Sequence, residues 1–117
     1  MNLPSDSACR WRNTGFSDMA RFKVYKNPDG AGYLLDVQAD LLKHLNTRLV
    51  VPLLPSPTAP KPAKVLNPCF EIAGESLVMT TQFMAAVPVR MLRTPVANLQ
   101  AERDQIVAAI DFLMQGF

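Results

Sequence analysis

Side chains able to carry acid–base chemistry are few in this sequence and lie far apart. His44 is the only histidine, and it lies on a short polar segment where a surface or capping role is more common than a catalytic one. Asp36 and Asp40 are close in sequence, but a strand-to-turn junction between them keeps them off a common helix face. Asp36 also has apolar neighbours, which favours a structural hydrogen bond. The residues therefore show no convincing acid and base pair for catalysis.

Ligands for a metal ion or a phosphate group are equally sparse. Cys9 and Cys69 are the two cysteines, and with one histidine they cannot complete a tetrahedral zinc site without carboxylates. No glycine-rich phosphate loop occurs. No secretion signal precedes the cysteines, so we expect reduced thiols in a cytoplasmic protein, with a disulfide as the less favoured alternative. We expect a protein that is not an enzyme and that binds no cofactor or metal.

The net charge and the short apolar runs of the chain argue against nucleic acid and membrane as partners. The formal net charge is +2 over 117 residues, which is too small to indicate a nucleic-acid surface. Arg48, Arg90 and Arg93 either form a basic patch or lie at solvated strand ends, and the second arrangement is more common. The longest apolar run is much shorter than a membrane span. We therefore expect neither a membrane nor a specific nucleic-acid sequence as a direct partner.

The first nineteen residues differ from the rest of the chain. They are rich in serine, aspartate and asparagine and show no sustained hydrophobic period. They also lack the apolar stretch or arginine-rich face of a targeting peptide. We expect residues 1–19 to be a disordered tail, or an over-extended start with Met19 as the natural first residue. Residues 20–117 are then one domain, because a chain with 49% hydrophobic residues can build a core.

Residues 21–54 have the pattern of a hairpin followed by a third strand. Phe22 and Val24 alternate with Lys23 and Tyr25, as in a strand with one buried face. A turn signal (NPDG) then precedes a second strand at residues 33–37. Residues 39–45 have the composition of a short helical turn. A third strand is predicted at residues 47–54, continuously apolar at its centre. Pro52 has no backbone donor, so this strand either lies at a sheet edge or bends there.

The next forty residues alternate between loops and strands. Four prolines in residues 55–62 predict a stiff, extended loop. Strands at residues 65–73 and 76–81 flank a hairpin turn at residues 73–75. A further strand is expected at residues 87–92, and Thr94 with Pro95 ends it.

A single helix is predicted at the end of the chain, over residues 98–115. One apolar stripe is formed by Leu99, Ile106, Ile110, Leu113 and Phe117. Asn98 is a suitable cap, and Gly116 fits the left-handed position that closes helices. Several short strands before one helix indicate a mainly β fold, an antiparallel sheet or small barrel covered by a C-terminal helix.

The last residue, Phe117, is apolar and follows this helix directly. Burial of a side chain of this size stabilises a structure by about 1.5–3 kcal/mol. Phe117 therefore either docks back on its own domain or inserts into another molecule, and the residues alone leave both arrangements open.

Several segments, in order, resemble the CcdB family of toxins. The first are residues 21–25 (RFKVY), 35–42 (LDVQADLL) and 48–53 (RLVVPL). Residues 79–89 (MTTQFMAAVPV) resemble the centre of the family, and residues 108–113 (AAIDFL) with Gly116 resemble its closing helix. The resemblance covers residues 20–117, with the same end point.

The resemblance implies an SH3-like antiparallel β-barrel with a C-terminal helix, and a homodimer. It implies the toxin of a type II toxin–antitoxin system, used in plasmid maintenance, which binds the A subunit of DNA gyrase and traps its cleaved-DNA complex. A CcdA-like antitoxin is the implied neutralising partner. The gyrase-binding positions carried over are Leu41, Leu42, Asp111, Met114, Gln115, Gly116 and Phe117.

The end of the chain departs from the family pattern. The best-known members end in Trp-Gly-Ile, whereas this chain ends in Gln-Gly-Phe. Tryptophan is a favoured interface anchor, and Gln115 cannot stack as an indole ring does. Two alternatives therefore stay open beside the gyrase poison: a diverged, non-toxic module that binds only its antitoxin, and a ribonuclease toxin on the related fold.

Overall fold

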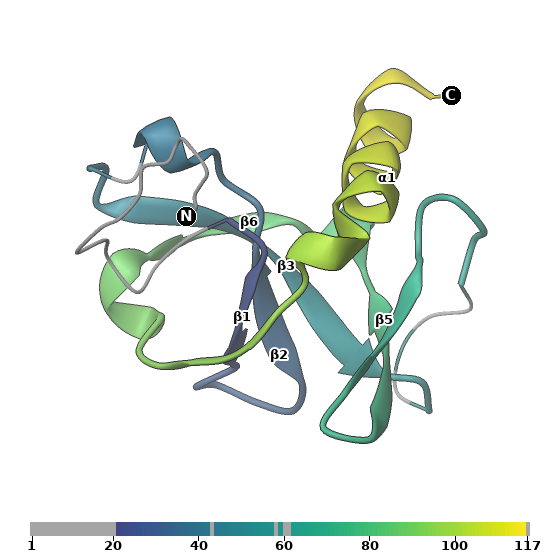
Figure 1. Cartoon of the computed structure of the whole chain (residues 1–117), viewed down its shortest axis with the longest axis horizontal. Helices are drawn as coiled ribbons and strands as arrows, with labels where there is room; N and C mark the ends of the chain where they lie inside the picture. The colour runs from purple at the N-terminus through teal and green to yellow at the C-terminus, as the bar shows by residue number, and fades with distance from the viewer. Residues whose placement is uncertain (1–20, 43, 58, 60–61, 117) are drawn as a thin grey trace, which may run out of the picture.

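The computed structural model describes residues 21–42, 44–57, 59 and 62–116 (Figure 1). The predicted N-terminal extension, with Cys9, lies outside the described residues, as does Phe117. The expectations for these residues stay predictions.

Within the described residues, seven strands form one curled antiparallel sheet (Figure 1). The strands are β1 (Lys23–Lys26), β2 (Tyr33–Asp36), β3 (Thr47–Pro55), β4 (Cys69–Ile72), β5 (Glu75–Met79), β6 (Ala85–Pro88) and β7 (Pro95–Asn98). Their order across the sheet is β4-β5-β3-β2-β1-β7, and β6 pairs with β3 beside this path. The sheet bends into a half-barrel that one C-terminal helix accompanies, so the predicted fold class is confirmed.

The first hairpin forms where the alternating pattern placed it. β1 pairs antiparallel with β2 in a register that sets Val24 opposite Leu35. Near the end of the turn, Gly32 has a φ of +87°, and a Cβ there would overlap the carbonyl oxygen of Leu53 on β3. Only glycine combines a positive φ with such a close backbone approach.

β3 is a central strand, so of the two arrangements expected at Pro52, a sheet edge or a bend, the sheet edge is wrong. β3 pairs with β2 on one side, and on the other with β6 at residues 47–50 and with β5 at residues 53–55. Pro52 lies between these two partners. Its carbonyl oxygen accepts hydrogen bonds from the backbone N–H and the hydroxyl of Thr80. β3 tolerates a residue without a backbone N–H here, because its neighbour on this side changes from β6 to β5 around Pro52.

Three predictions about strand boundaries are wrong in the second half of the chain. β4 begins at Cys69, and residues before it are held by Asn67, whose side chain donates to the carbonyl of Met79. The strand predicted at residues 87–92 is β6, which begins at Ala85, followed by the 3₁₀ turn η3 (Val89–Met91). Pro95, expected to end a strand, instead begins β7, an edge strand of the described sheet, where proline is tolerated.

The C-terminal helix is shorter than predicted at its start. A 3₁₀ turn, η4 (Gln100–Glu102), comes first, and the side chain of Asn98 accepts a hydrogen bond from the N–H of Gln100. The helix α1 then runs over Arg103–Gln115. Gly116 has a φ of +81° and donates its N–H to the carbonyl of Phe112 at 2.8 Å, as predicted for a left-handed cap.

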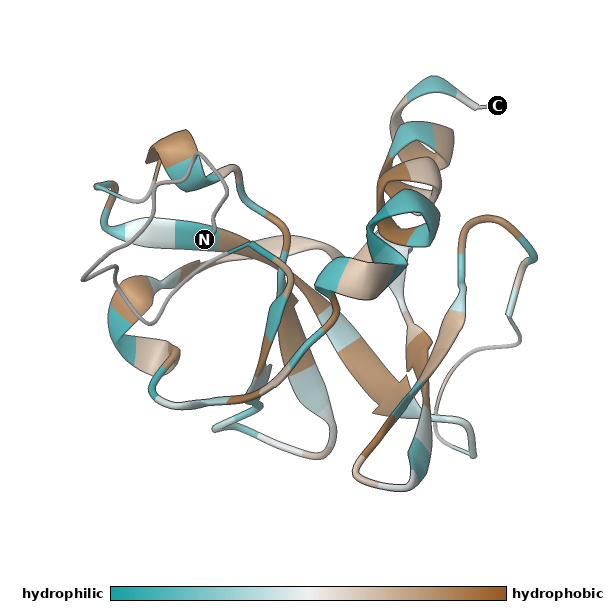
Figure 2. Cartoon of the chain, in the orientation of Figure 1, coloured by the Kyte–Doolittle hydropathy of each residue, from teal (hydrophilic) through white to brown (hydrophobic). Residues whose placement is uncertain are grey.

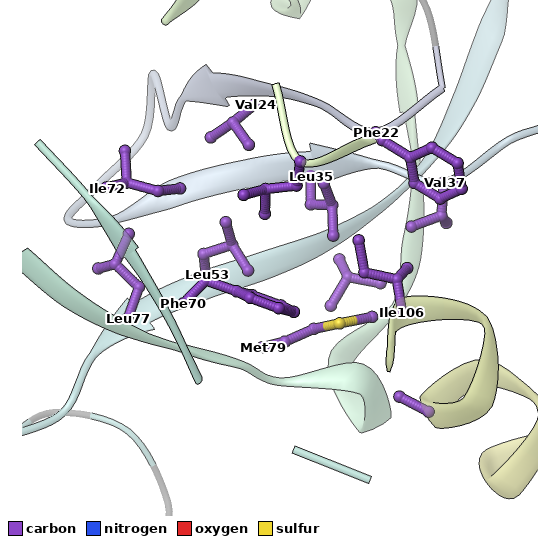
Figure 3. Close-up of a cluster of buried hydrophobic side chains, with 13 residues drawn as sticks. Phe22, Val24, Leu35, Val37, Leu53, Phe70, Ile72, Leu77, Met79 and Ile106 are labelled. Carbon is purple, nitrogen blue, oxygen red and sulfur yellow. The ribbon is translucent and has the colours of Figure 1, made fainter. Parts of the chain in front are cut away.

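The main hydrophobic core fills the hollow of the sheet and receives one face of α1 (Figures 2 and 3). Val24, Leu35, Leu53 and Leu77 are fully buried there, and Ile106 brings the helix into the cluster. A smaller cluster lies on the other face of the sheet, formed by Tyr25, Leu34, Val50 and Leu92. No helix in the described part of the chain is long and apolar enough to span a membrane.

Candidate functional site

The last turn of α1 leaves apolar side chains in solvent. Ile106 and Ala109 at the start of the stripe are fully buried, whereas Leu113 is 38% exposed and Met114 is 67% exposed. The helix projects past the sheet toward its C-terminal end, as Figure 1 shows. The core therefore uses the predicted stripe as far as Ile110 and leaves the last turn of the helix exposed.

The other predicted residues on this helix are exposed as well. Asp111, Gln115 and Gly116 lie at the surface beside Met114. The structure thus places four of the seven predicted gyrase-binding residues on one accessible helix end. The fifth residue of this group, Phe117, lies outside the described part.

A second exposed apolar surface lies on the 3₁₀ turn η1 (Asp40–Leu42), which follows β2. Leu41 is 89% exposed and Leu42 is 43% exposed, and Figure 2 shows this turn as an apolar segment among polar neighbours. Leu45, 42% exposed, belongs to the same loop and was not predicted from the sequence. Its spacing of four residues from Leu41 was the available signal.

The two exposed surfaces do not meet within one chain. Figure 1 shows η1 at one side of the molecule and the end of α1 at the other. A partner that contacts both surfaces must either span the molecule or meet them on two copies of the chain.

Beside η1, Arg48 belongs to a buried ion pair, and neither to a basic patch nor to a solvated strand end. Arg48 and Asp36 have fully buried side chains, and the Nε and Nη2 of Arg48 donate to the two carboxylate oxygens of Asp36 at 2.8 and 2.9 Å. The prediction that Arg48 lies at a solvated strand end is therefore wrong, while Arg90 and Arg93 are exposed. The structural hydrogen bond expected for Asp36 is confirmed.

Burial dominates the electrostatics of this pair. Removal of water raises the pKa of the Asp36 carboxyl above its ordinary value of 3.8, and the hydrogen bond and charge of Arg48 oppose the rise. Arg48 Nη1 is buried without a hydrogen-bond partner in the described structure. Because both side chains are fully buried, this pair stabilises the fold and is not accessible to a substrate.

Groups for catalysis are not assembled in the described residues. His44 is exposed, as predicted, and Cys69 is an exposed free thiol. No three histidine, cysteine, aspartate or glutamate side chains of the described chain are placed to hold a metal ion. An open cavity of about 440 Å³ between the first hairpin and β7 is lined by Lys26, Asn27, Pro28, Met91, Arg93, Thr94 and Val96. These lining residues include cations but no general base.

The sequence of the described domain matches one protein family along nearly its whole length. A family model described as "CcdB protein" matches residues 21–116. This chain belongs to the CcdB family. The expected resemblance is thereby confirmed, and with it a family of toxins from toxin–antitoxin systems.

Solved structures similar to this CcdB-family chain confirm the fold. One is an endoribonuclease in complex with its cognate antitoxin from a mycobacterial species, with a TM-score of 0.64 and 14% identity over 82% of this chain and 94% of that chain. Another is an endoribonuclease from a mycobacterial species, with a TM-score of 0.64 and 15% identity over 86% and 95% of the two chains. At identities this low, the similarity shows a shared fold alone.

Proposed function

We propose that this CcdB-family protein is a toxin that binds the A subunit of DNA gyrase and stabilises the enzyme's cleaved-DNA complex. A CcdA-like antitoxin neutralises it, and both act in the cytoplasm. The observation that carries the proposal is the exposure of Leu113 and Met114 at the end of α1, beyond the part of the helix that the core uses.

Exposed apolar side chains on a rigid element are the usual anchors of a protein interface. Leu113 and Met114 belong to a regular helix that Gly116 closes, so their positions are set before a partner arrives. Methionine adapts to an irregular partner surface. The helix end therefore supports binding to a protein more directly than it supports a reaction.

In the proposed mechanism, binding shifts the population of gyrase toward its cleaved-DNA state. A protein without chemistry of its own stabilises cleaved gyrase only as far as it binds that state more tightly than the others. The proposed binding residues are Leu41, Leu42, Asp111, Met114, Gln115, Gly116 and Phe117. A homodimer would offer two copies of each surface to the two A subunits, which accommodates their separation within one chain.

The decisive experiment is expression without antitoxin in a sensitive host. Growth arrest with accumulation of cleaved DNA, relieved by substitutions in gyrase A, supports the proposal. Arrest with cleavage of bulk RNA, unaffected by gyrase variants, identifies a ribonuclease instead, which the folds of the structural neighbours also accommodate. Normal growth together with antitoxin binding identifies a non-toxic module, the outcome that Gln115 in place of tryptophan would explain.

A further inference from the structure

The loop between β2 and β3, residues 37–46, carries three exposed leucines and is nevertheless tied down at its base. The N–H of Val37 donates to the carbonyl of Leu49 at 3.0 Å. Arg48 holds Asp36 through two hydrogen bonds and donates a third, from Nη2, to the carbonyl of Gln38 at 3.1 Å. The two strands that enter and leave the loop are thus joined side by side.

A single side chain, Gln38, connects this base to the apex of the loop. Its Nε2 donates to the carbonyl of Leu42 at 3.1 Å and to the carbonyl of Thr47 at 3.3 Å. Its Oε1 accepts from the N–H of Leu49 at 3.1 Å. One amide group therefore fixes the apical turn, the first residue of β3 and the residue two positions further along that strand.

The outer side of the loop has its own tie. The N–H of Arg21 donates to Oδ1 of Asp40 at 2.9 Å, and Nε of Arg21 donates to the carbonyl of Val37 at 3.1 Å. Within the apex, the N–H of Leu42 donates to the carbonyl of Ala39 and the N–H of Leu45 to the carbonyl of Leu42. These hydrogen bonds hold the described backbone of the apex while the side chains of Leu41, Leu42 and Leu45 are exposed.

This arrangement has a cost for folding and a benefit for binding. Leucine side chains held in water contribute nothing to the core, and ordering a loop costs backbone conformational entropy. An interface element ordered in advance does not lose that entropy when it binds. We propose that Gln38 is a positioning residue that pre-organises the η1 turn, and with it Leu41 and Leu42, for contact with gyrase A. The inference rests on the proposed function for the identity of the partner.

Two substitutions of Gln38 and one control test the proposal. Gln38→Ala removes all three side-chain hydrogen bonds. Gln38→Glu keeps the size and the acceptor but removes both donors to the carbonyls of Leu42 and Thr47. The control is Gln105→Ala on α1, which makes the same chemical change at an exposed residue whose side chain donates a hydrogen bond to Glu102 at 3.2 Å.

Hydrogen exchange of the Leu42 and Leu45 amides and affinity for purified gyrase A are measured for each variant. We expect both Gln38 variants to exchange at these amides at least about tenfold faster and to lose about tenfold in affinity, since hydrogen bonds contribute about 1 kcal/mol each and a factor of ten corresponds to about 1.4 kcal/mol. Gln105→Ala should match the wild type in both measurements.

Three results would overturn the proposal. Unchanged exchange at Leu42 and Leu45 shows that Gln38 does not order the loop. Faster exchange that extends equally to Leu77 and Val78 in β5 shows general destabilisation. Faster exchange confined to the loop with unchanged affinity shows that the order has no role in binding. If wild-type protein does not bind gyrase A at all, the proposed function fails, and the exchange data still decide whether Gln38 orders the loop.

Discussion

Asp36 and Arg48 form a fully buried bidentate ion pair between the end of β2 and the start of β3. The pair lies on the sheet face that carries the smaller cluster around Val50, since Asp36 is directly opposite Val50 in the register. Its position beside the Gln38 hydrogen bonds links the core of the sheet to the exposed η1 turn. Two predictions follow from this pair alone.

Removal of one partner of the ion pair should lower the free energy of unfolding strongly. Replacement of both partners by apolar residues should lower it much less. Arg48→Met leaves the Asp36 carboxylate buried without a cation, and we expect a loss of about 3–5 kcal/mol in the free energy of unfolding. The double variant Asp36→Leu with Arg48→Met removes both charges and should be more stable than Arg48→Met. Urea unfolding of the wild type, both single variants and the double variant gives the coupling energy. Additive effects would show that the two side chains do not stabilise one another.

The pair also gives stability a defined dependence on pH. The pKa of Asp36 in the folded protein is raised, chiefly by burial, above the ordinary value of 3.8. The folded state therefore binds this proton more tightly than the unfolded state. The contribution of Asp36 to stability is fully present below about 3.8 and is lost as pH rises through the folded pKa.

Comparison with Asp36→Asn isolates this effect, because asparagine does not titrate. The stability of the wild type relative to Asp36→Asn should fall as pH rises from about 3.8 through the folded pKa of Asp36. Urea unfolding of both proteins across this range measures the difference. A difference that instead grows with pH would mean that Arg48 outweighs burial and lowers the pKa.

Gly32 provides a test of the close approach between the first hairpin and β3. Gly32→Ala places a Cβ against the carbonyl oxygen of Leu53 at a φ of +87°, and we expect a loss of at least about 2 kcal/mol from strain and displacement. Gly30→Ala in the same turn meets open space and should change stability by less than about 1 kcal/mol. Thermal unfolding of the two variants compares them, and equal effects would contradict the described contact.

The sequence predicted local elements better than it predicted which residues meet across the sheet. The first hairpin and the Gly116 cap follow from alternation and from glycine, both local signals. The burial of Arg48 depends on Asp36, twelve residues away, and only strand register brings the two together. The sheet edge expected at Pro52 and the strand end expected at Pro95 were wrong, because the place of each proline in the sheet depends on partner strands that the local sequence does not show.

The candidate site likewise contains residues that the sequence predicted and one that it did not. Exposure of Met114 and of the η1 leucines agrees with the positions carried over from the CcdB family, whereas the role of Gln38 was not predicted. A glutamine within a strand-to-turn segment carries no local signal. Its three hydrogen bonds exist only because residues 42, 47 and 49 come within reach of one amide.

The central claim is that the end of α1 acts on a partner and is dispensable for folding. Its most direct test is deletion of residues 115–117, with gyrase A binding and thermal unfolding measured on the same preparation. We expect affinity to fall at least about thirtyfold, the loss of a hot spot of about 2 kcal/mol. The free energy of unfolding should change by no more than about 1 kcal/mol. Unchanged affinity, or a truncated protein that no longer folds, would contradict the account.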